Sequence, residues 1–176
     1  MKGKTICLEL EEPLSKPQDC DEGWFYFPSL NSCYRYFNVT RTWQEAEEFC
    51  NQLPYYGNLA TVTSDEHNTF ISNVVRAVDA SKPWTWIGLN DIWKEGTFSW
   101  VDGTSYTYRN WIESQPDDYR GNEDCVHIKF TSKCSSKKNV IFFETDKKSC
   151  RSSEGQTASI EKTKLLMFQA EILHQD

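Results

Sequence analysis

The stretch Trp86–Gly103, WIGLNDIWKEGTFSWVDG, contains the ends of two strand-like segments joined by an acidic turn. The mainly apolar run at residues 84–89 is typical of a buried strand. Residues 97–103 alternate between apolar and polar side chains and end in the turn dipeptide Asp-Gly. Asp91 and Glu95 come directly after the first segment. We therefore expect two strands with two carboxylates in the connection between them.

A second acidic stretch, QPDDYRGNEDC, lies at residues 115–125. Four carboxylates gather there around Tyr119, with only Arg120 to offset them: Asp117, Asp118, Glu123 and Asp124. Carboxylates this close repel one another unless a cation or solvent lies among them. Calcium takes about six to eight oxygen ligands, often in flexible loops. The polar residues from 103 to 125 have no period, and loops this long are usually functional or disordered.

The residues before this region predict two helices. Two pairs have the capping-box spacing of a helix start, Thr42 with Glu45 and Thr63 with Glu66. Each is followed by apolar residues at helical spacing: Trp43, Ala46, Cys50 and Leu53 in the first helix, and Phe70, Ile71, Val74, Val75 and Val78 in the second. Because such stripes usually face a core, we expect both helices to pack on a sheet.

Further strands are expected on both sides of these helices. Aromatic runs at 24–27 and 33–37 are separated by a turn composition, which predicts a hairpin that Cys20 and Cys33 flank. Segments 125–130 and 139–143 are later strand candidates.

The pattern predicts one domain over residues 20–150. Residues 1–19 and 151–176 are interpreted as tails, the second with a short helix over 164–173.

Composition excludes some classes of function. The formal net charge is −7, and there is no basic stripe, which argues against nucleic acid as a partner. No run of about 18 apolar residues is present, so no membrane span is expected. The N-terminus also lacks the apolar core of a signal peptide.

Seven cysteines are typical of disulfides formed in an oxidising compartment, so we expect a secreted protein despite the missing leader. The odd number leaves at least one thiol free or bonded to another chain. Cys7 is the candidate for an intermolecular bridge that would support oligomerisation, or else a fortuitous cysteine in a tail.

The ordered series of these motifs resembles a C-type lectin-like domain of the long form, over about residues 20–145. The motifs are the aromatic hairpin with two cysteines, the helix ending in Cys50, "WIGL" at 86–89, "W-x-D-G" at 100–103, "QPD" at 115–117 and "EDC" at 123–125. The resemblance implies an α+β fold in which two helices flank two small antiparallel sheets below a long calcium-binding loop region. It also implies disulfides joining Cys20 to Cys33, Cys50 to the last core cysteine, and Cys125 to a cysteine between.

The same resemblance implies two Ca²⁺ sites. Acids at five positions would hold an auxiliary ion: Asp91, Glu95, Asp118, Glu123 and Asp124. Gln115, Asp117 and Glu123 would hold a primary ion whose shell is completed by sugar hydroxyls. "QPD" resembles the binders of galactose and N-acetylgalactosamine. Pro116 is then expected to be cis, and Tyr119 either stacks on the sugar ring or packs in the loop.

The pattern is interrupted after Cys125. The family's Trp-Asn-Asp triplet, whose Asn-Asp pair supplies primary calcium ligands, is absent. Cys134 comes early, nine residues after Cys125, and Phe143 is interpreted as standing in place of the final cysteine, with Cys150 as its substitute. Fewer ligands mean weaker calcium binding, so we expect weak or no calcium-dependent sugar binding. These departures suggest an altered product of a lectin gene, such as a splice form or a divergent copy.

Two functions remain open at this point. The first is a calcium-dependent lectin for galactose or N-acetylgalactosamine, impaired by the lost ligands, and the second is a calcium-independent module that binds a protein ligand. An enzyme is not expected, because no nucleophile motif or paired zinc-ligand spacing is present. Asn38-Val39-Thr40 is a glycosylation sequon, used only if the chain enters the secretory pathway.

Overall fold

The computed structural model describes residues 20–53, 57–121, 123–130, 141–146 and 164–170, the last of these for the backbone only. In chain order the elements are β1 Phe25–Phe27, the 3-10 turn η1 Pro28–Leu30, β2 Ser32–Phe37, α1 Trp43–Gln52, β3 Asn58–Leu59, α2 Asp65–Val78, β4 Thr85–Asn90, β5 Ser99–Trp100, β6 Cys125–Phe130, β7 Ile141–Asp146 and β8 Lys164–Ala170. In this part of the chain, no helix is both long and apolar enough to cross a lipid bilayer.

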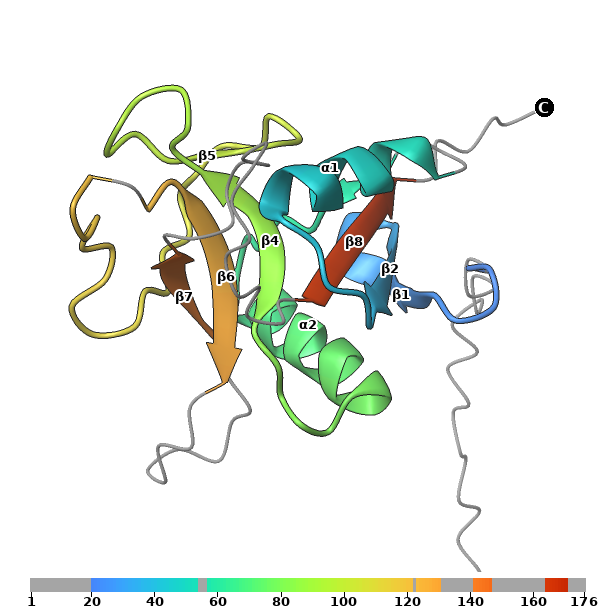
Figure 1. Ribbon diagram of the computed structural model, residues 1–176. Helices are drawn as coiled ribbons and strands as arrows, with labels where there is room; N and C mark the ends of the chain where they lie inside the picture. The colour runs from blue at the N-terminus through green and yellow to red at the C-terminus, as the bar shows by residue number, and fades with distance from the viewer. Residues whose placement is uncertain (1–19, 54–56, 122, 131–140, 147–163, 171–176) are drawn as a thin grey trace, which may run out of the picture.

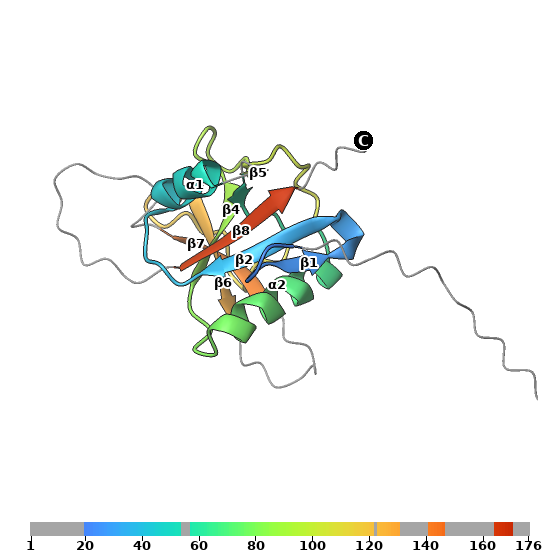
Figure 2. The same cartoon turned by 90° about the vertical axis from the view of Figure 1, so that its right-hand side faces the viewer.

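The described strands form one hydrogen-bonded sheet in the order β1-β2-β8-β4-β6-β7, with β3 paired to β8 and β5 paired to β4. The pairings are antiparallel except that of β4 with β8, which is parallel and joins the two antiparallel halves. Helices α1 and α2 lie on opposite sides of the strands (Figures 1 and 2). The expected α+β fold is confirmed, and its two small sheets are connected through this parallel pair.

Strand β4 is the centre of the molecule, and its six residues are all buried. Trp86 packs in a cluster with α1 and donates its indole N–H to the Arg41 carbonyl at 3.0 Å. Ile87 belongs to the other cluster, which includes buried residues of α2. Gly88 permits a close approach here, because an added Cβ would lie 2.6 Å from the Val101 side chain and 2.8 Å from the Leu59 carbonyl oxygen. The buried strand expected over 84–89 is therefore confirmed, one residue further along the chain.

The two helices start with side-chain caps. Thr42 and Glu45 form the expected capping box at α1. The cap of α2 is Ser64, whose hydroxyl accepts from the His67 N–H at 3.1 Å, and not Thr63 as predicted. The predicted apolar stripe is correct except at its end, where Val78 is 52% exposed.

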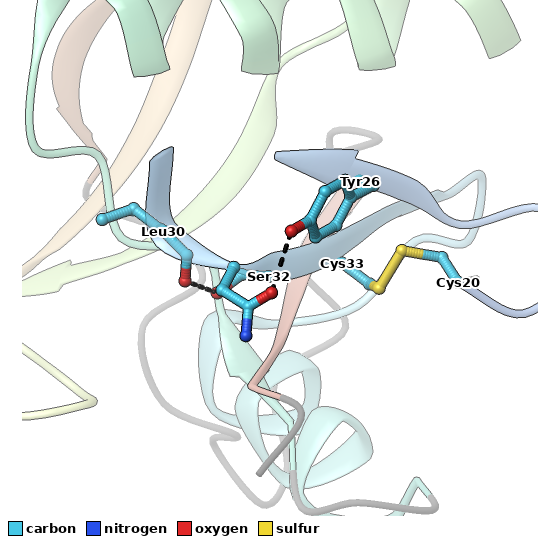
Figure 3. Close-up of a disulfide and its surroundings, with 6 residues drawn as sticks. Cys20, Tyr26, Leu30, Ser32 and Cys33 are labelled. Carbon is cyan, nitrogen blue, oxygen red and sulfur yellow. Dashed lines mark hydrogen bonds between the residues drawn. A yellow bond between two sulfur atoms is a disulfide. The ribbon is translucent and has the colours of Figure 1, made fainter. Parts of the chain in front are cut away.

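The N-terminal hairpin is confirmed, with Phe25 opposite Tyr34. Figure 3 shows the Cys20–Cys33 disulfide, whose Cα atoms are 5.9 Å apart, beside the hairpin turn. The Tyr26 hydroxyl donates to Asn31 across that turn at 2.9 Å. The disulfide thus holds the segment before β1 against β2, and the hydrogen bond closes the turn between the two strands.

In the C-terminal half, the structure differs from the expected short helix over 164–173 and from the expected domain end at residue 150. Residues Lys164–Ala170 form strand β8 between β2 and β4, where a short helix in a tail was expected, so the sheet includes residues beyond the predicted boundary at 150. Without this segment, the facing edges of β2 and β4 would have unpaired backbone N–H and C=O groups. A strand at 164–170 pairs with these groups, whereas a helix would leave them unsatisfied.

Cys50 is a free, buried thiol instead of the predicted disulfide partner. It packs with Trp43 and Trp86 on the α1 side of the sheet, whereas Phe143 packs in the other cluster. Phe143 therefore does not face Cys50, and the prediction that it stands in place of the cysteine that would pair with Cys50 is wrong. Burial raises the pKa of the Cys50 thiol, so it is expected to be unreactive.

We expect the stability of the protein to fall in acid because of His67. Its ring is fully buried, stacks on Phe27 at 4.7 Å, and has its pKa lowered to about 4 by burial. The unfolded chain binds this proton near pH 6.5, so protonation favours unfolding as the pH falls from about 6.5 towards 4. Urea unfolding at about pH 7 and pH 4.5 measures the loss. The wild type should lose about 2–3 kcal/mol more than His67→Gln; equal losses would contradict this account.

Candidate functional site

The loop between β5 and β6 is attached to β7, beside which it runs (Figure 1). Ile112 N–H donates to the Phe143 carbonyl at 3.0 Å, and Phe143 N–H donates to the Asn110 carbonyl at 2.8 Å. The Asn110 amide also donates to the Ile141 carbonyl at 2.6 Å. Trp111 packs its ring against Phe143 at 5.8 Å between centroids. These contacts fix the start of the acidic stretch to a strand of the sheet.

Three of the predicted primary ligands meet at this strand. The Gln115–Pro116 peptide is cis, as expected. The Gln115 amide donates to Asp117 at 2.6 Å, and its carbonyl accepts from the backbone N–H of Thr145 at 3.1 Å. The Thr145 hydroxyl lies 2.5 Å from the Gln115 carbonyl oxygen and 2.9 Å from a Glu123 carboxylate oxygen. We call these four side chains the Gln115 cluster.

Thr145 is the site residue that sequence reasoning missed. It lies on β7, and its hydroxyl contacts the Gln115 and Glu123 side chains. The signal was present in the alternation of β7, where Ile141, Phe143 and Thr145 are buried and the residues between are half-buried. The interpretation of Phe143 as a substitute for a cysteine did not take into account that Phe143 and Thr145 face the same side of β7.

The carboxylates of the Gln115 cluster are only partly compensated by their neighbours. Burial raises the pKa of Glu123, and the neighbouring Asp117 carboxylate raises it further, while the Thr145 hydroxyl lowers it. Two carboxylates, an amide and a hydroxyl form an all-oxygen donor set, which suits Ca²⁺. Only two of its four donors are charged, so we expect any ion held there to bind weakly.

Tyr119 and Arg120 lie at the exposed side of this loop. The Tyr119 side chain is 52% exposed, and the Arg120 guanidinium lies 5.1 Å from the centre of its ring. Its exposure is compatible with stacking on a ligand, but Arg120 already contacts the ring.

The predicted auxiliary ligands centre on Asp91, which directly follows β4. Asp91 is 3% exposed; its Oδ2 accepts from the Gly96 N–H at 2.8 Å, while its Oδ1 has no hydrogen-bond partner. Its backbone N–H donates to the Asp124 carbonyl at 3.0 Å. Burial raises the pKa of Asp91 to about 6, and the charges of Glu95 and Asp124 act in the same direction. A buried carboxylate oxygen without a donor, close to two further acids, fits a cation.

The other predicted ligands of the auxiliary ion do not all lie together. Asp118 accepts from the Glu123 N–H at 3.2 Å, which ties it to the Gln115 cluster. Among the described residues, no three His, Cys, Asp or Glu side chains are placed so that they could hold a metal ion together. The acids therefore lie near one another without forming a complete metal site in the described residues.

Other predicted residues are also accounted for. Cys125 is disulfide-bonded, and its partner, like Cys7, Cys134 and Cys150, lies outside the described residues. Asn38 of the sequon is exposed between β2 and α1, so its glycosylation stays a prediction.

Comparisons with known proteins agree with this arrangement. The family model of the Lectin C-type domain matches residues 39–141. An α-N-acetylgalactosamine-specific lectin of Patiria pectinifera is 40% identical over 101 residues, covering 56% of this chain and 60% of its own length. Echinoidin of Heliocidaris crassispina is 33% identical over 119 residues, covering 62% of this chain and 80% of its own length. The chain thus spans about 60% of the length of the first of these relatives.

Solved structures extend the likeness to the fold. The C-type lectin CEL-I of Cucumaria echinata superimposes with a TM-score of 0.68 at 24% identity, covering 85% of this chain and 96% of its own. A fold with two helices on opposite sides of a sheet, and a long loop that carries the oxygen-rich cluster, defines a C-type lectin-like domain. The chain belongs to the C-type lectin family.

We expect Asp91→Asn to reduce the stabilisation of the protein by calcium. Calcium that binds only the folded state stabilises it by about 1.4 kcal/mol at a tenfold excess over the dissociation constant. The wild type should therefore melt a few degrees higher in calcium than in EDTA. Asp91→Asn should show a smaller shift than the wild type, because any ion at the Gln115 cluster would still bind, and it should melt higher than the wild type in EDTA because it relieves the repulsion among these acids.

Differential scanning calorimetry of the oxidised protein measures this shift, with Asp21→Asn on the exposed N-terminal segment as the control. An equal calcium shift in wild type and Asp91→Asn would show that Asp91 is not a ligand.

Proposed function

We propose that this protein is a secreted lectin, without enzymatic activity, that binds terminal galactose or N-acetylgalactosamine in a calcium-dependent manner and with low calcium affinity. The observation that carries the proposal is the convergence of Gln115, Asp117 and Glu123 beside the exposed Tyr119. A calcium ion bound there would take two vicinal sugar hydroxyls into its shell. The printed specificity of the Patiria relative, N-acetylgalactosamine, supports the same class of sugar.

The side chains of the cluster would then have separate tasks. Asp117 and Glu123 supply negative charge and oxygen ligands to the ion. Gln115 offers both a carbonyl and an amide, so it can accept from one sugar hydroxyl and donate to another. The exposed ring of Tyr119 would cover the apolar face of the sugar. Arg120, whose guanidinium lies 5.1 Å from the centre of this ring, would have to move away from it.

The secreted location is supported by the Cys20–Cys33 disulfide, which persists only in an oxidising compartment.

A second candidate function is a calcium-independent module that binds a protein through the same loops. The Thr145 contacts favour it, because a hydroxyl and an N–H already satisfy Gln115 and Glu123 without an ion. Binding that is unchanged by EDTA would select this alternative.

Retention on immobilised galactose tests the leading proposal. We expect the wild type to be retarded at millimolar calcium and to elute unretarded in EDTA, with immobilised mannose as the comparison resin. Asp117→Asn removes a charged ligand and should abolish the retardation, whereas the same change at the exposed Asp21 should not. Equal retardation of Asp117→Asn, or of the wild type in EDTA, would contradict the proposal.

Thr145→Asp should strengthen calcium binding. A carboxylate at this position would face Gln115 and Glu123, adding a charged ligand where the wild type has a hydroxyl. We expect the calcium concentration for half-maximal retention on galactose to fall at least about tenfold. In EDTA the variant should melt below the wild type, because the new charge lies beside Glu123.

Thr145→Val is the matched control, since it removes the hydroxyl without adding a charge. An unchanged calcium requirement in Thr145→Asp would show that Thr145 does not adjoin the ion.

A further inference from the structure

A cavity apart from the Gln115 cluster lies on the α1 side of the sheet. It has a volume of about 540 Å³ and is lined by residues of α1, the end of β4 and the segment around β5. None of the Gln115 cluster residues lines it. Small-molecule sites usually fall between about 300 and 1,000 Å³, so its size is in the range of a ligand pocket.

The rim of this cavity carries Trp93. Its side chain is 91% exposed, the highest exposure among the large hydrophobic side chains of the described residues. Trp43 also lines the cavity; it is buried, and its indole N–H donates to the Ile87 carbonyl at 2.8 Å. Covering an exposed aromatic ring with an apolar surface lowers the free energy of the system.

The cavity also contains an unsatisfied acceptor. Asn90 is 4% exposed, and its amide nitrogen contacts the Gly88 and Ser99 carbonyl oxygens at 3.4 and 3.3 Å. These two carbonyls fix the amide so that Oδ1 is the free end, and Oδ1 has no partner. Asn90 lines the cavity together with residues of α1. A buried acceptor without a donor costs about 1–3 kcal/mol, which a ligand O–H or N–H would recover.

The charges around the cavity select a neutral ligand. Glu47 is the only charged residue of its lining, so nothing there attracts an anion. The Glu47 carboxylate oxygens already accept from the Asn51 amide at 2.9 Å and the Leu59 N–H at 2.8 Å, so no cation is required. The lining therefore fits a neutral ligand that has hydroxyl donors and an apolar ring face.

We propose that this cavity is a calcium-independent subsite for a neutral sugar ring, which stacks on Trp93 and donates a hydroxyl to Asn90 Oδ1. Saccharides combine the two required features, since their hydroxyls lie around the ring edge and their C–H groups form its faces. The subsite does not depend on the Gln115 cluster, so it can exist whether or not the proposed calcium-dependent function holds.

Titration in EDTA tests the subsite apart from the Gln115 cluster. The probes are methyl β-galactoside and N-acetylgalactosamine at tens of millimolar, followed by the indole N–H resonances of the ¹⁵N-labelled protein. We expect the Trp93 resonance, identified by its loss in Trp93→Ala, to shift and saturate with at least one probe. Saturation-transfer signals from that sugar should weaken at least about tenfold in Trp93→Ala and stay unchanged in Asp117→Asn.

Trp84→Ala is the matched control, because Trp84 is 36% exposed and contacts His127 away from the cavity. Its sugar signals should equal those of the wild type. Three results would overturn the proposal: no indole shift with either sugar, signals that persist in Trp93→Ala, or a Trp93 shift with N-acetyltyrosinamide and with neither sugar. The last result would assign the cavity to a protein side chain.

Discussion

The attachment of the long loop to β7 is the constraint on which the site depends. Two backbone hydrogen bonds, from Ile112 to Phe143 and from Phe143 to Asn110, set the register between a segment without regular structure and a strand of the sheet. Gln115 then lies opposite Thr145, and the acids that follow are held close to it. Because β7 pairs with β6, which pairs with the central β4, the rigidity of the sheet is passed to the loop.

This arrangement shows how the chain differs from the pattern of its family. Thr145 offers a hydroxyl and an N–H to side chains that the family pattern turns toward an ion, so the Gln115 cluster is largely satisfied from within. Asp91 remains different, because its buried Oδ1 has no donor. The chain therefore keeps the electrostatic demand for a cation at one position and reduces it at the other.

Sequence reasoning succeeded where the signal is local. The capping box at Thr42, the hairpin between the aromatic runs and the buried strand at "WIGL" are each decided by a few adjacent residues, and all three are present. It failed where the answer depends on pairing between distant segments. Residues 164–170 join the sheet beside β2 and β4, and the partner of Thr145 is set by the register of β7 against the loop. The alternation of β7 indicates which way Thr145 faces, but the local pattern does not give the partner of either segment. Asn90 was likewise invisible, because an unsatisfied acceptor is recognised only when its surroundings are known.

The central claim is that the Gln115 cluster receives the sugar through a calcium ion. A crystal structure of the oxidised protein grown with calcium and methyl β-galactoside tests it most directly. The account predicts an ion in contact with Asp117 and Glu123, with two sugar hydroxyls completing its shell. Well-ordered loops with Thr145 still bonded to Gln115 and Glu123, and neither ion nor sugar between them, would contradict it.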